Sequence, residues 1–286
     1  MFGKRTDGRR LFLEDPIIGL TPYLMPKRDD SQVMVTQQID CDTLTRYIRA
    51  QRDRGAQLSY MDLVIAAYVR TVAKYPQFNR FIMNKKIYAR NHIAISLAIL
   101  KMTEGDKIQE TTIKVKIPPQ ATLKDVHDLF AQAIEENRKP STENLTDKVA
   151  TLLLRAPWLT TVIVSLARFA DRYGFMPKAL LEASPFHTSM FITNMASLGM
   201  PSVYHHIYNF GTTSVFIGMG RIERKPEPLA QGGVRFTRII PLGVVIDERI
   251  ACGAEYSRAF TYMRDLLLNP ALLEVPPEEV NTDTGR

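Results

Sequence analysis

The sequence predicts an α/β fold, a two-layer α+β sandwich in which helices flank one mixed β-sheet. The first reason is that segments of two-residue apolar periodicity and segments of helical periodicity are intermingled along the chain. The second is that no internal repeat and no Pro/Ala-rich linker divides it. The third is size, because 286 residues with 45% hydrophobic side chains can bury a large core. One domain is therefore expected at 32–273, after an N-terminal arm at 1–31 and before a flexible tail at 274–286.

Strands are expected where β-forming residues alternate with polar ones. The first such segment is QVMVTQQI at 32–39, and FIMNKKIYA is typical of a hairpin that turns at Asn84-Lys85. The other expected strands are 92–100, 107–117, 188–194, 212–222, 233–238 and 241–246.

Helices are expected where a small polar residue precedes a segment of helical periodicity and glycine or proline follows it. The expected helices run from Asp40 or Asp42 to about Arg54, from Ser59 to before Pro76, after Thr122, within 143–182, and from about 254 to 268. The helix after Ser59 has little polar face, so we expect it to be largely buried.

Charge and cysteine content restrict the classes of partner. The net charge of +7 and pI near 9.3 indicate either a solvated basic surface or attraction to an anion, such as a phosphate-bearing cofactor or an acidic membrane surface. No block of Lys and Arg with interleaved aromatics is present, so no nucleic-acid partner is expected. Cys41 and Cys252 form neither a disulfide framework nor a zinc pattern, so no metal is expected. The N-terminus lacks the apolar region of a signal peptide, which predicts a cytoplasmic protein.

Three segments, in chain order, carry a family resemblance. They are LSYMDLVIAAYVRTVAKYPQFNRFIMNKKIYARNHIAISLAI, then MFITNMASLG followed by TSVFIGMGRIERKP, then DERIACGAEYSRAFTYMRDLLLNP. Together they resemble the catalytic domain of the dihydrolipoyl acyltransferases of 2-oxoacid dehydrogenase complexes, which shares its fold with chloramphenicol acetyltransferase. The resemblance covers roughly residues 32–273.

The resemblance implies a fold, an assembly and a reaction. The fold is a mixed sheet with flanking helices, and the chains are expected to form a homotrimer with its active site between subunits. Coenzyme A or an acyl-CoA is the expected substrate, entering a channel opposite the acyl partner. In the family a histidine acts as general base and a serine hydroxyl stabilises the oxyanion. No lipoyl domain is recognised in the sequence, so no swinging arm is expected within this chain.

The aligned segments place specific residues at these positions. Glu248 stands where the family has its catalytic histidine, and Cys252 stands where the family has Asp or Asn. Thr193 stands at the serine, followed by Asn194, and threonine keeps a hydroxyl donor. An ordinary carboxylate matches a thiol poorly as a base unless burial raises its pKa, so Glu248 is either an altered base or a surface carboxylate.

Two further interpretations remain open for the side chains around this site. Cys252 either packs the turn or acts as a nucleophile. His205 and His206, in the connection after the Thr193 strand, are either a substitute base or part of a polar loop at a trimer contact. The chain is accordingly either an acyltransferase with a diverged site or a non-catalytic homo-oligomer that serves binding or assembly.

The stretch 149–170, VATLLLRAPWLTTVIVSLARFA, is strongly apolar. Arg155, Pro157 and Arg168 interrupt it, and a charged residue at mid-bilayer costs about 2.5–3.5 kcal/mol, which argues against a spanning helix. We expect helices that pack on the core or over an acyl pocket, or an interfacial helix that makes peripheral contact with a membrane.

Overall fold

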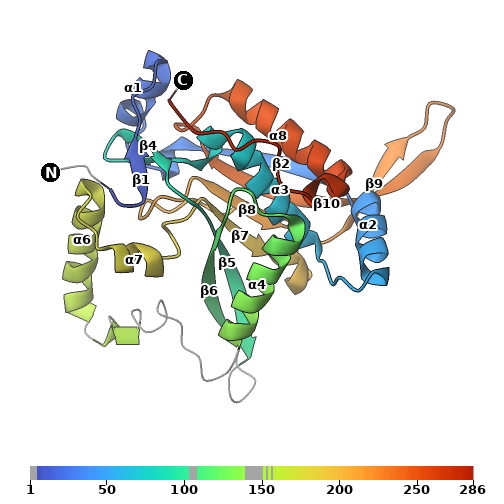
Figure 1. Ribbon diagram of the computed structural model, residues 1–286, viewed down its shortest axis with the longest axis horizontal. Coiled ribbons are helices and arrows are strands. Elements are labelled where there is room, and N and C mark those ends of the chain that lie inside the picture. The colour runs from blue at the N-terminus through green and yellow to red at the C-terminus, as the bar shows by residue number, and fades with distance from the viewer. Residues whose placement is uncertain (1–4, 103–107, 139–150, 153, 156, 286) are drawn as a thin grey trace.

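The computed structural model describes residues 5–285, apart from 103–107, 139–150, 153 and 156 (Figure 1). Its main sheet has seven strands, in the order β2-β10-β8-β7-β5-β6, with β9 paired to β10. These strands are β2 (Gln32–Asp40), β5 (Ile93–Met102), β6 (Ile108–Ile117), β7 (Met190–Asn194), β8 (Val215–Met219), β9 (Glu223–Pro228) and β10 (Val234–Asp247). The pairs β5–β7 and β7–β8 are parallel and the others are antiparallel, so the predicted mixed sheet is confirmed.

Helices cover one face of this sheet. They include α2 (Cys41–Asp53), α3 (Tyr60–Lys74), α4 (Leu123–Arg138) and α8 (Gly253–Leu268). In Figure 1, α3 lies between α4 and α8 in front of the strands, and it contacts both of them. Almost every side chain of α3 from Asp62 to Ala73 is buried, as its continuous apolar sequence predicts. The main hydrophobic core therefore lies between these helices and one face of the sheet.

Local capping explains where these helices begin. Asp40 accepts a hydrogen bond from the amide of Asp42 at the start of α2. Ser59 and Asp62 form a reciprocal capping box at the start of α3, with the Ser59 amide 2.7 Å from the Asp62 carboxylate. The predicted hairpin is also present: β3 (Arg80–Met83) and β4 (Lys86–Arg90) are joined by Asn84 and Lys85, both with positive φ.

The N-terminal arm is an ordered part of the fold. It contains β1 (Gly8–Arg10), which pairs with β4, and α1 (Pro16–Leu24), followed by a 3-10 turn, η1 (Asp29–Ser31). The chain beyond residue 273 also makes specific contacts, because the Asp283 carboxylate accepts a 2.6 Å hydrogen bond from Arg80. Within the expected helical region 143–182, the structure has α6 (Pro157–Tyr173) and α7 (Lys178–Ala183), and residues 143–150 lie outside the described residues.

The prediction of two strands at 233–238 and 241–246 was wrong, because β10 runs continuously through Pro241. The Pro241 carbonyl accepts a hydrogen bond from the Gly220 amide, so the residue's hydrogen-bonding edge faces the end of β8. The ladder with β8 begins only at Leu242. The missing N–H of Pro241 therefore removes no bond from that ladder, and the strand continues.

Candidate active site

One segment crosses the sheet face opposite the helices. Residues 201–207, named the strap below, follow the 3-10 turn η3 (Met195–Leu198) and lie over β8 and β10. The Val203 carbonyl oxygen is so close to Gly218 and Gly243 that a Cβ on either would lie 2.5 or 2.4 Å from it. Glycine at these two positions is what allows the strap to lie flat on the sheet.

Thr193 lies on this same face, at the end of β7. It is 9% exposed, and it pairs in register with Gly218, directly beneath the strap. Phe191, two residues earlier, belongs to a small cluster with Phe216 and Val245 that is separate from the main core. Within the described residues the buried Thr193 Oγ1 has no hydrogen-bond partner. A buried hydroxyl without a partner is costly, which is a reason to ask what it binds.

His205 enters the same region from the strap. Its ring stacks on that of Phe216 with centroids 4.6 Å apart, and Phe216 in turn stacks on Phe191 at 4.9 Å. The buried His205 Nε2 also has no hydrogen-bond partner within the described part of the chain. Burial lowers the pKa of His205, and the neighbouring His206 lowers it further. The imidazole is therefore held in its neutral form, which can accept a proton.

The two adjacent histidines have different surroundings. His206 is exposed, and its ring lies 4.8 Å from that of Tyr208. The strap itself is held at Ile207, whose amide donates a 2.6 Å hydrogen bond to Gln32 Oε1, and at Tyr204, whose hydroxyl contacts that of Thr36 on β2. Only His205 of the pair faces the sheet.

Glu248 and Cys252 lie elsewhere. Both are exposed and line a groove of about 520 Å³ between β2 and α8, on the helix-covered side of the sheet. Thr193 is level with Gly218, and Gly218 with Gly243, so Glu248, just past the end of β10, is five residues further along the chain. At about 3.3 Å per residue this is roughly 16 Å. Within one chain, Glu248 and Thr193 cannot touch the same reacting atom.

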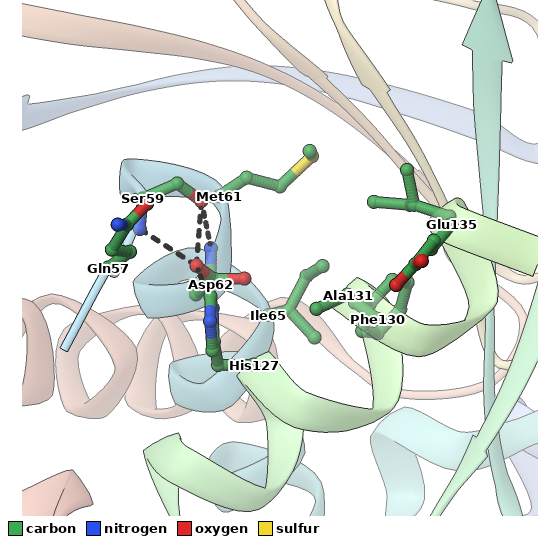
Figure 2. A pocket seen from close by; sticks show the side chains of 10 residues that line it. Gln57, Ser59, Met61, Asp62, Ile65, His127, Phe130, Ala131 and Glu135 are labelled. Carbon is green, nitrogen blue, oxygen red and sulfur yellow. Dashed lines mark hydrogen bonds and ion pairs between the residues drawn. The ribbon is translucent and has the colours of Figure 1, made fainter. Parts of the chain in front are cut away.

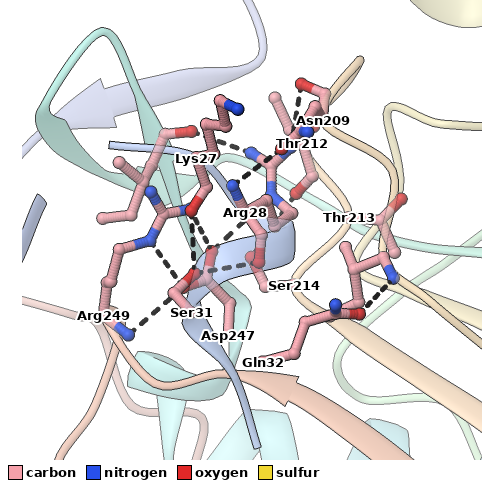
Figure 3. Close-up of polar contacts among 12 residues, drawn as sticks. Lys27, Arg28, Ser31, Gln32, Asn209, Thr212, Thr213, Ser214, Asp247 and Arg249 are labelled. Carbon is pink, nitrogen blue, oxygen red and sulfur yellow. Dashed lines mark hydrogen bonds and ion pairs between the residues drawn. The ribbon is translucent and has the colours of Figure 1, made fainter. Parts of the chain in front are cut away.

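The loop that carries Glu248 is built on a buried ion cluster (Figure 3). Asp247 is fully buried, and its carboxylate accepts hydrogen bonds of 2.8 and 2.7 Å from Arg249 and one of 3.1 Å from the Ser31 hydroxyl. Arg28 lies 3.6 Å away, and burial lowers its pKa to about 10 despite the opposing effect of Asp247. Asp247 and Arg249, the loop residues that match the family pattern, therefore stabilise the backbone conformation of the loop.

The side chain of Asn194 also has a structural role. Its side-chain oxygen accepts a hydrogen bond from the Ser197 amide and caps η3. Gly199, with φ of 69°, then ends that turn and leads the chain into the strap. The segment after Thr193 therefore sets where His205 lies.

Two other histidines form polar contacts that sequence reasoning did not assign. His187 Nε2 is 3.1 Å from the Asp171 carboxylate, and its Nδ1 is 2.8 Å from the Ser184 hydroxyl. His127 Nδ1 is 3.0 Å from Asp62, which also accepts from Ser59, beside an open groove of about 630 Å³ between α3 and α4 (Figure 2). Their acidic partners, Asp171 and Asp62, are 16 and 65 residues distant in sequence, so no local pattern reveals these two contacts.

Two general features of the described chain bear on its chemistry. No cluster of three or more His, Cys, Asp or Glu side chains suited to a metal ion occurs among the described residues. In the same part of the chain, no helix combines the length and apolar character needed to cross a membrane.

Comparisons with known proteins give the family context. Residues 26–105 match the family model of the 2-oxoacid dehydrogenases acyltransferase (catalytic domain). Over 82 residues, 29% of this chain, the sequence is 32% identical to the dihydrolipoyllysine-residue acetyltransferase component of the pyruvate dehydrogenase complex of Acholeplasma laidlawii. That match spans only 14% of the relative's length.

Three solved structures share the fold. The dihydrolipoamide acetyltransferase of Azotobacter vinelandii, studied for the role of a serine, a histidine and an asparagine in its catalytic mechanism, gives a TM-score of 0.57 at 15% identity over 90% of this chain and 88% of that one. The cubic core of the pyruvate dehydrogenase multienzyme complex gives 0.55 at 16% identity, over 90% and 88%. Chloramphenicol acetyltransferase gives 0.55 at 12% identity, over 91% and 99%.

At these identities the structural likeness concerns the fold, and the sequence match concerns residues 26–105. The two findings agree with each other, and the sequence match includes the first of the three segments that carried the resemblance. Residues 26–105 are similar in sequence to the catalytic domain of the 2-oxoacid dehydrogenase acyltransferases, and the described chain has the fold common to the catalytic cores of those acyltransferases and to chloramphenicol acetyltransferase.

Proposed function

We propose that this domain transfers an acyl group between a CoA-type thioester and an acceptor, with Thr193 and His205 as its catalytic residues. The observation that carries the proposal is that Thr193 Oγ1 and His205 Nε2 are both buried and lack partners within the described residues. They lie on the same face of the sheet, beside the aromatic pair Phe191 and Phe216. A donor and a neutral base kept out of water are the two groups that acyl transfer needs.

Each group has a defined part in the reaction. The neutral imidazole of His205 accepts the proton of the acceptor's thiol or hydroxyl as that group attacks the thioester carbonyl carbon. The Thr193 hydroxyl donates a hydrogen bond to the oxyanion of the tetrahedral intermediate. Collapse of the intermediate breaks the carbon–sulfur bond, and the departing CoA thiolate takes up the proton from His205. No covalent enzyme intermediate is required.

We favour His205 over Glu248 as the base because of their positions. Glu248 is exposed, and about 16 Å of strand separates it from Thr193. His205 shares the face of Thr193, and its lowered pKa keeps it neutral near pH 7. Glu248 and Cys252 can join the site only from a neighbouring subunit, as in the inter-subunit arrangement that the resemblance implies.

The proposal includes a homotrimer, because Glu248 and Cys252 can reach the site only from a neighbouring subunit. The sheet face beyond the strap exposes Leu100 on β5 and Met34 on β2, which are 40% and 52% exposed in the single chain. A second copy covering this face would exclude water from Thr193 and complete a channel for a CoA-like molecule.

The alternative is a non-catalytic member that retains the fold for binding or assembly. One observation favours it, namely the exposed carboxylate at the position of the family histidine. Calorimetric titration with coenzyme A and acyl-CoAs tests whether the protein binds these ligands. An enzyme or a non-catalytic binding protein is expected to bind them, whereas a protein that serves only assembly is expected to bind neither.

The direct test incubates the protein with a panel of acyl-CoAs and thiol or hydroxyl acceptors and titrates the released CoA thiol. Thr193→Val and His205→Asn are each expected to lower the rate by about 10²-fold or more. His206→Asn, which changes the exposed neighbour, is the matched control and is expected to leave the rate unchanged. Equal rates for wild type, Thr193→Val and His205→Asn would reject the proposed site.

Mixing refolded Thr193→Val and His205→Asn chains then locates the site. If Thr193 and His205 act within one chain, mixed oligomers stay inactive, because every chain lacks one group. Recovery of activity on mixing would show that the two residues act across a subunit boundary.

A further inference from the structure

Helix α6 directs its apolar side to solvent, whereas the helices that cover the sheet direct theirs to the core. The side chains of Trp158, Val162, Leu166 and Phe169, named the α6 stripe below, recur at helical spacing along one side. They are 76%, 49%, 62% and 57% exposed. The opposite side of the helix, which carries Asp171, is the side that faces the body. Contiguous exposed apolar side chains of this size mark an interaction surface.

The helix is fixed to the body near its C-terminal end. Asp171 is buried, and its carboxylate accepts a 2.8 Å hydrogen bond from Arg5 and lies 3.1 Å from His187 Nε2. The Arg5 guanidinium also donates to the Asp171 carbonyl at 2.7 Å. These contacts fix the rotation of α6, so the outward direction of the α6 stripe is set by a buried ion pair.

The charges around the α6 stripe are positive. Arg155, Arg168 and Arg172 are exposed at or near α6, and Lys178 follows at the start of α7. The single carboxylate within α6 is Asp171, which Arg5 and His187 already engage, so it leaves the exposed arginines unneutralised. A symmetric contact between two copies through α6 would set these arginines against each other, which disfavours a second copy as the occupant.

A second apolar element lies near the same end of the molecule. Figure 1 shows α1 and α6 on the same side, near the N-terminus. The hairpin turn of β3 and β4 connects them, because Arg172 Nε donates to Asn84 Oδ1 at 3.1 Å and Lys85 Nζ lies 5.1 Å from the Tyr23 ring centre. The exposed side chains of α1 are again apolar, namely those of Ile17, Leu20, Tyr23 and Leu24.

We propose that α6 binds the surface of an anionic lipid bilayer, with the α6 stripe among the upper acyl chains and the arginines at the headgroup phosphates. An apolar face with Trp, Leu and Phe and an arginine-rich polar face is the composition of an interfacial helix. Tryptophan at one end of the stripe suits the membrane interface, where an aromatic body and a polar N–H are both accommodated. This inference does not rest on the acyl transfer proposed above.

Vesicle binding provides the test, and the chain supplies its own probe. Trp158 is the single tryptophan, so its fluorescence reports on the α6 stripe alone. With vesicles of phosphatidylcholine and phosphatidylglycerol at low salt, the emission is expected to shift to the blue and the protein to sediment with the lipid. Vesicles of phosphatidylcholine alone, or high salt, are expected to weaken both signals.

Substitutions separate the apolar and the charged contributions. Leu166→Ser with Phe169→Ser is expected to lower vesicle partitioning by roughly a hundred-fold, and Arg168→Gln by about five-fold. Val234→Ser with Phe236→Ser is the matched control, because these side chains are equally exposed (56% and 63%) but belong to the β9–β10 hairpin. Circular dichroism and the unfolding midpoint verify that each variant is folded.

The outcomes that would overturn the proposal are specific. Absence of binding to anionic vesicles at low salt would do so, as would equal binding by wild type and the Leu166→Ser, Phe169→Ser variant. A variant that changes the sedimentation mass of the free protein while vesicle binding stays intact would assign α6 to a contact between copies of this chain instead.

Discussion

Two regions of the sheet differ in the way they hold polar side chains. At the end of β10, the buried side chains of Asp247 and Arg249 are hydrogen-bonded to each other and to their surroundings, while Glu248 between them is exposed to solvent. Beneath the strap, Thr193 is buried and His205 is half-buried, and the buried Thr193 Oγ1 and His205 Nε2 have no partner among the described residues.

This difference teaches which positions are structural and which are available for chemistry. A satisfied buried cluster stabilises one backbone conformation and has little remaining capacity to bind a ligand. A buried donor and a buried acceptor without partners cost free energy in the empty protein, and a bound substrate can recover that cost. In the proposed site, β7 carries Thr193 and the strap carries His205, whereas Asp247 and Arg249 stabilise the loop around Glu248.

The largest expected effect tests the frame. Asp247→Asn leaves the buried Arg249 and Arg28 without their counter-charge, so we expect a loss of about 3–5 kcal/mol in the free energy of unfolding, measured by urea denaturation. Asp265→Asn is the control, because Asp265 makes a solvent-exposed pair with Arg264 and should change stability by less than about 0.5 kcal/mol. A loss at Asp247 no larger than at Asp265 would contradict the structural role of the cluster.

The next effect distinguishes chemistry from packing at Thr193, beneath the strap. Thr193→Val keeps the shape and removes a hydroxyl that has no partner, so stability is expected to stay constant or to rise by about 1 kcal/mol. Acyl transfer is expected to fall by about 10²–10³-fold in kcat with little change in KM, because the hydroxyl acts on the oxyanion. Parallel losses of stability and activity would instead identify Thr193 as a packing residue.

The strap gives an intermediate effect. Gly218→Ala would place a Cβ 2.5 Å from the Val203 carbonyl oxygen, so the strap must move and carry His205 with it. We expect a cost of about 1–3 kcal/mol in unfolding free energy and a loss of activity. Gly253→Ala, where an added Cβ meets nothing within 4 Å, is the matched control and is expected to be neutral or stabilising. Unchanged activity in Gly218→Ala would separate the strap from the reaction.

Acid pH should weaken the protein through its partly buried histidines. Burial lowers the folded-state pKa of His205, and it lowers that of His92 to about 4. The unfolded chain then binds more protons below about pH 6.5, so stability is present above that pH and is lost as pH falls toward the folded-state values. Urea titrations at several pH values measure this slope, and His205→Asn is expected to reduce it. If His205 is the base, the acid limb of kcat/KM also lies below the ordinary histidine value.

Most elements of the fold could be predicted from periodicity and capping, because those signals are local. The box of Ser59 and Asp62 and the turn at Asn84 and Lys85 each specify a boundary within a few residues. The continuity of β10 through Pro241 could not be predicted, because it depends on which neighbouring strand faces the proline. The outward stripe of α6 depends likewise on Asp171, which pairs with a residue 166 positions away.

The candidate site was predictable only in part. Sequence alone named Thr193, His205 and Glu248 as candidates, and the resemblance placed Glu248 at the position of the base. Sequence alone could not show their spacing within one chain, because the ladders set Thr193 level with Gly243 and leave Glu248 just past the end of β10. His205 and His206 are adjacent in sequence and differ only in their surroundings, because the ring of His205 stacks on that of Phe216.

The smallest expected effect is at Glu248. Glu248→Gln removes a charge from an exposed side chain, so stability should change by less than about 0.5 kcal/mol, and activity should be unchanged if His205 is the base. A fall of 10²-fold or more in kcat would instead mean that Glu248 reaches Thr193 from a neighbouring subunit. Glu248→His with Cys252→Asp distinguishes these cases further. If His205 is the base, this double substitution is expected to leave the activity of the otherwise wild-type protein unchanged. In a His205→Asn background, it is expected to restore activity only if a subunit contact brings the loop of Glu248 next to the strap.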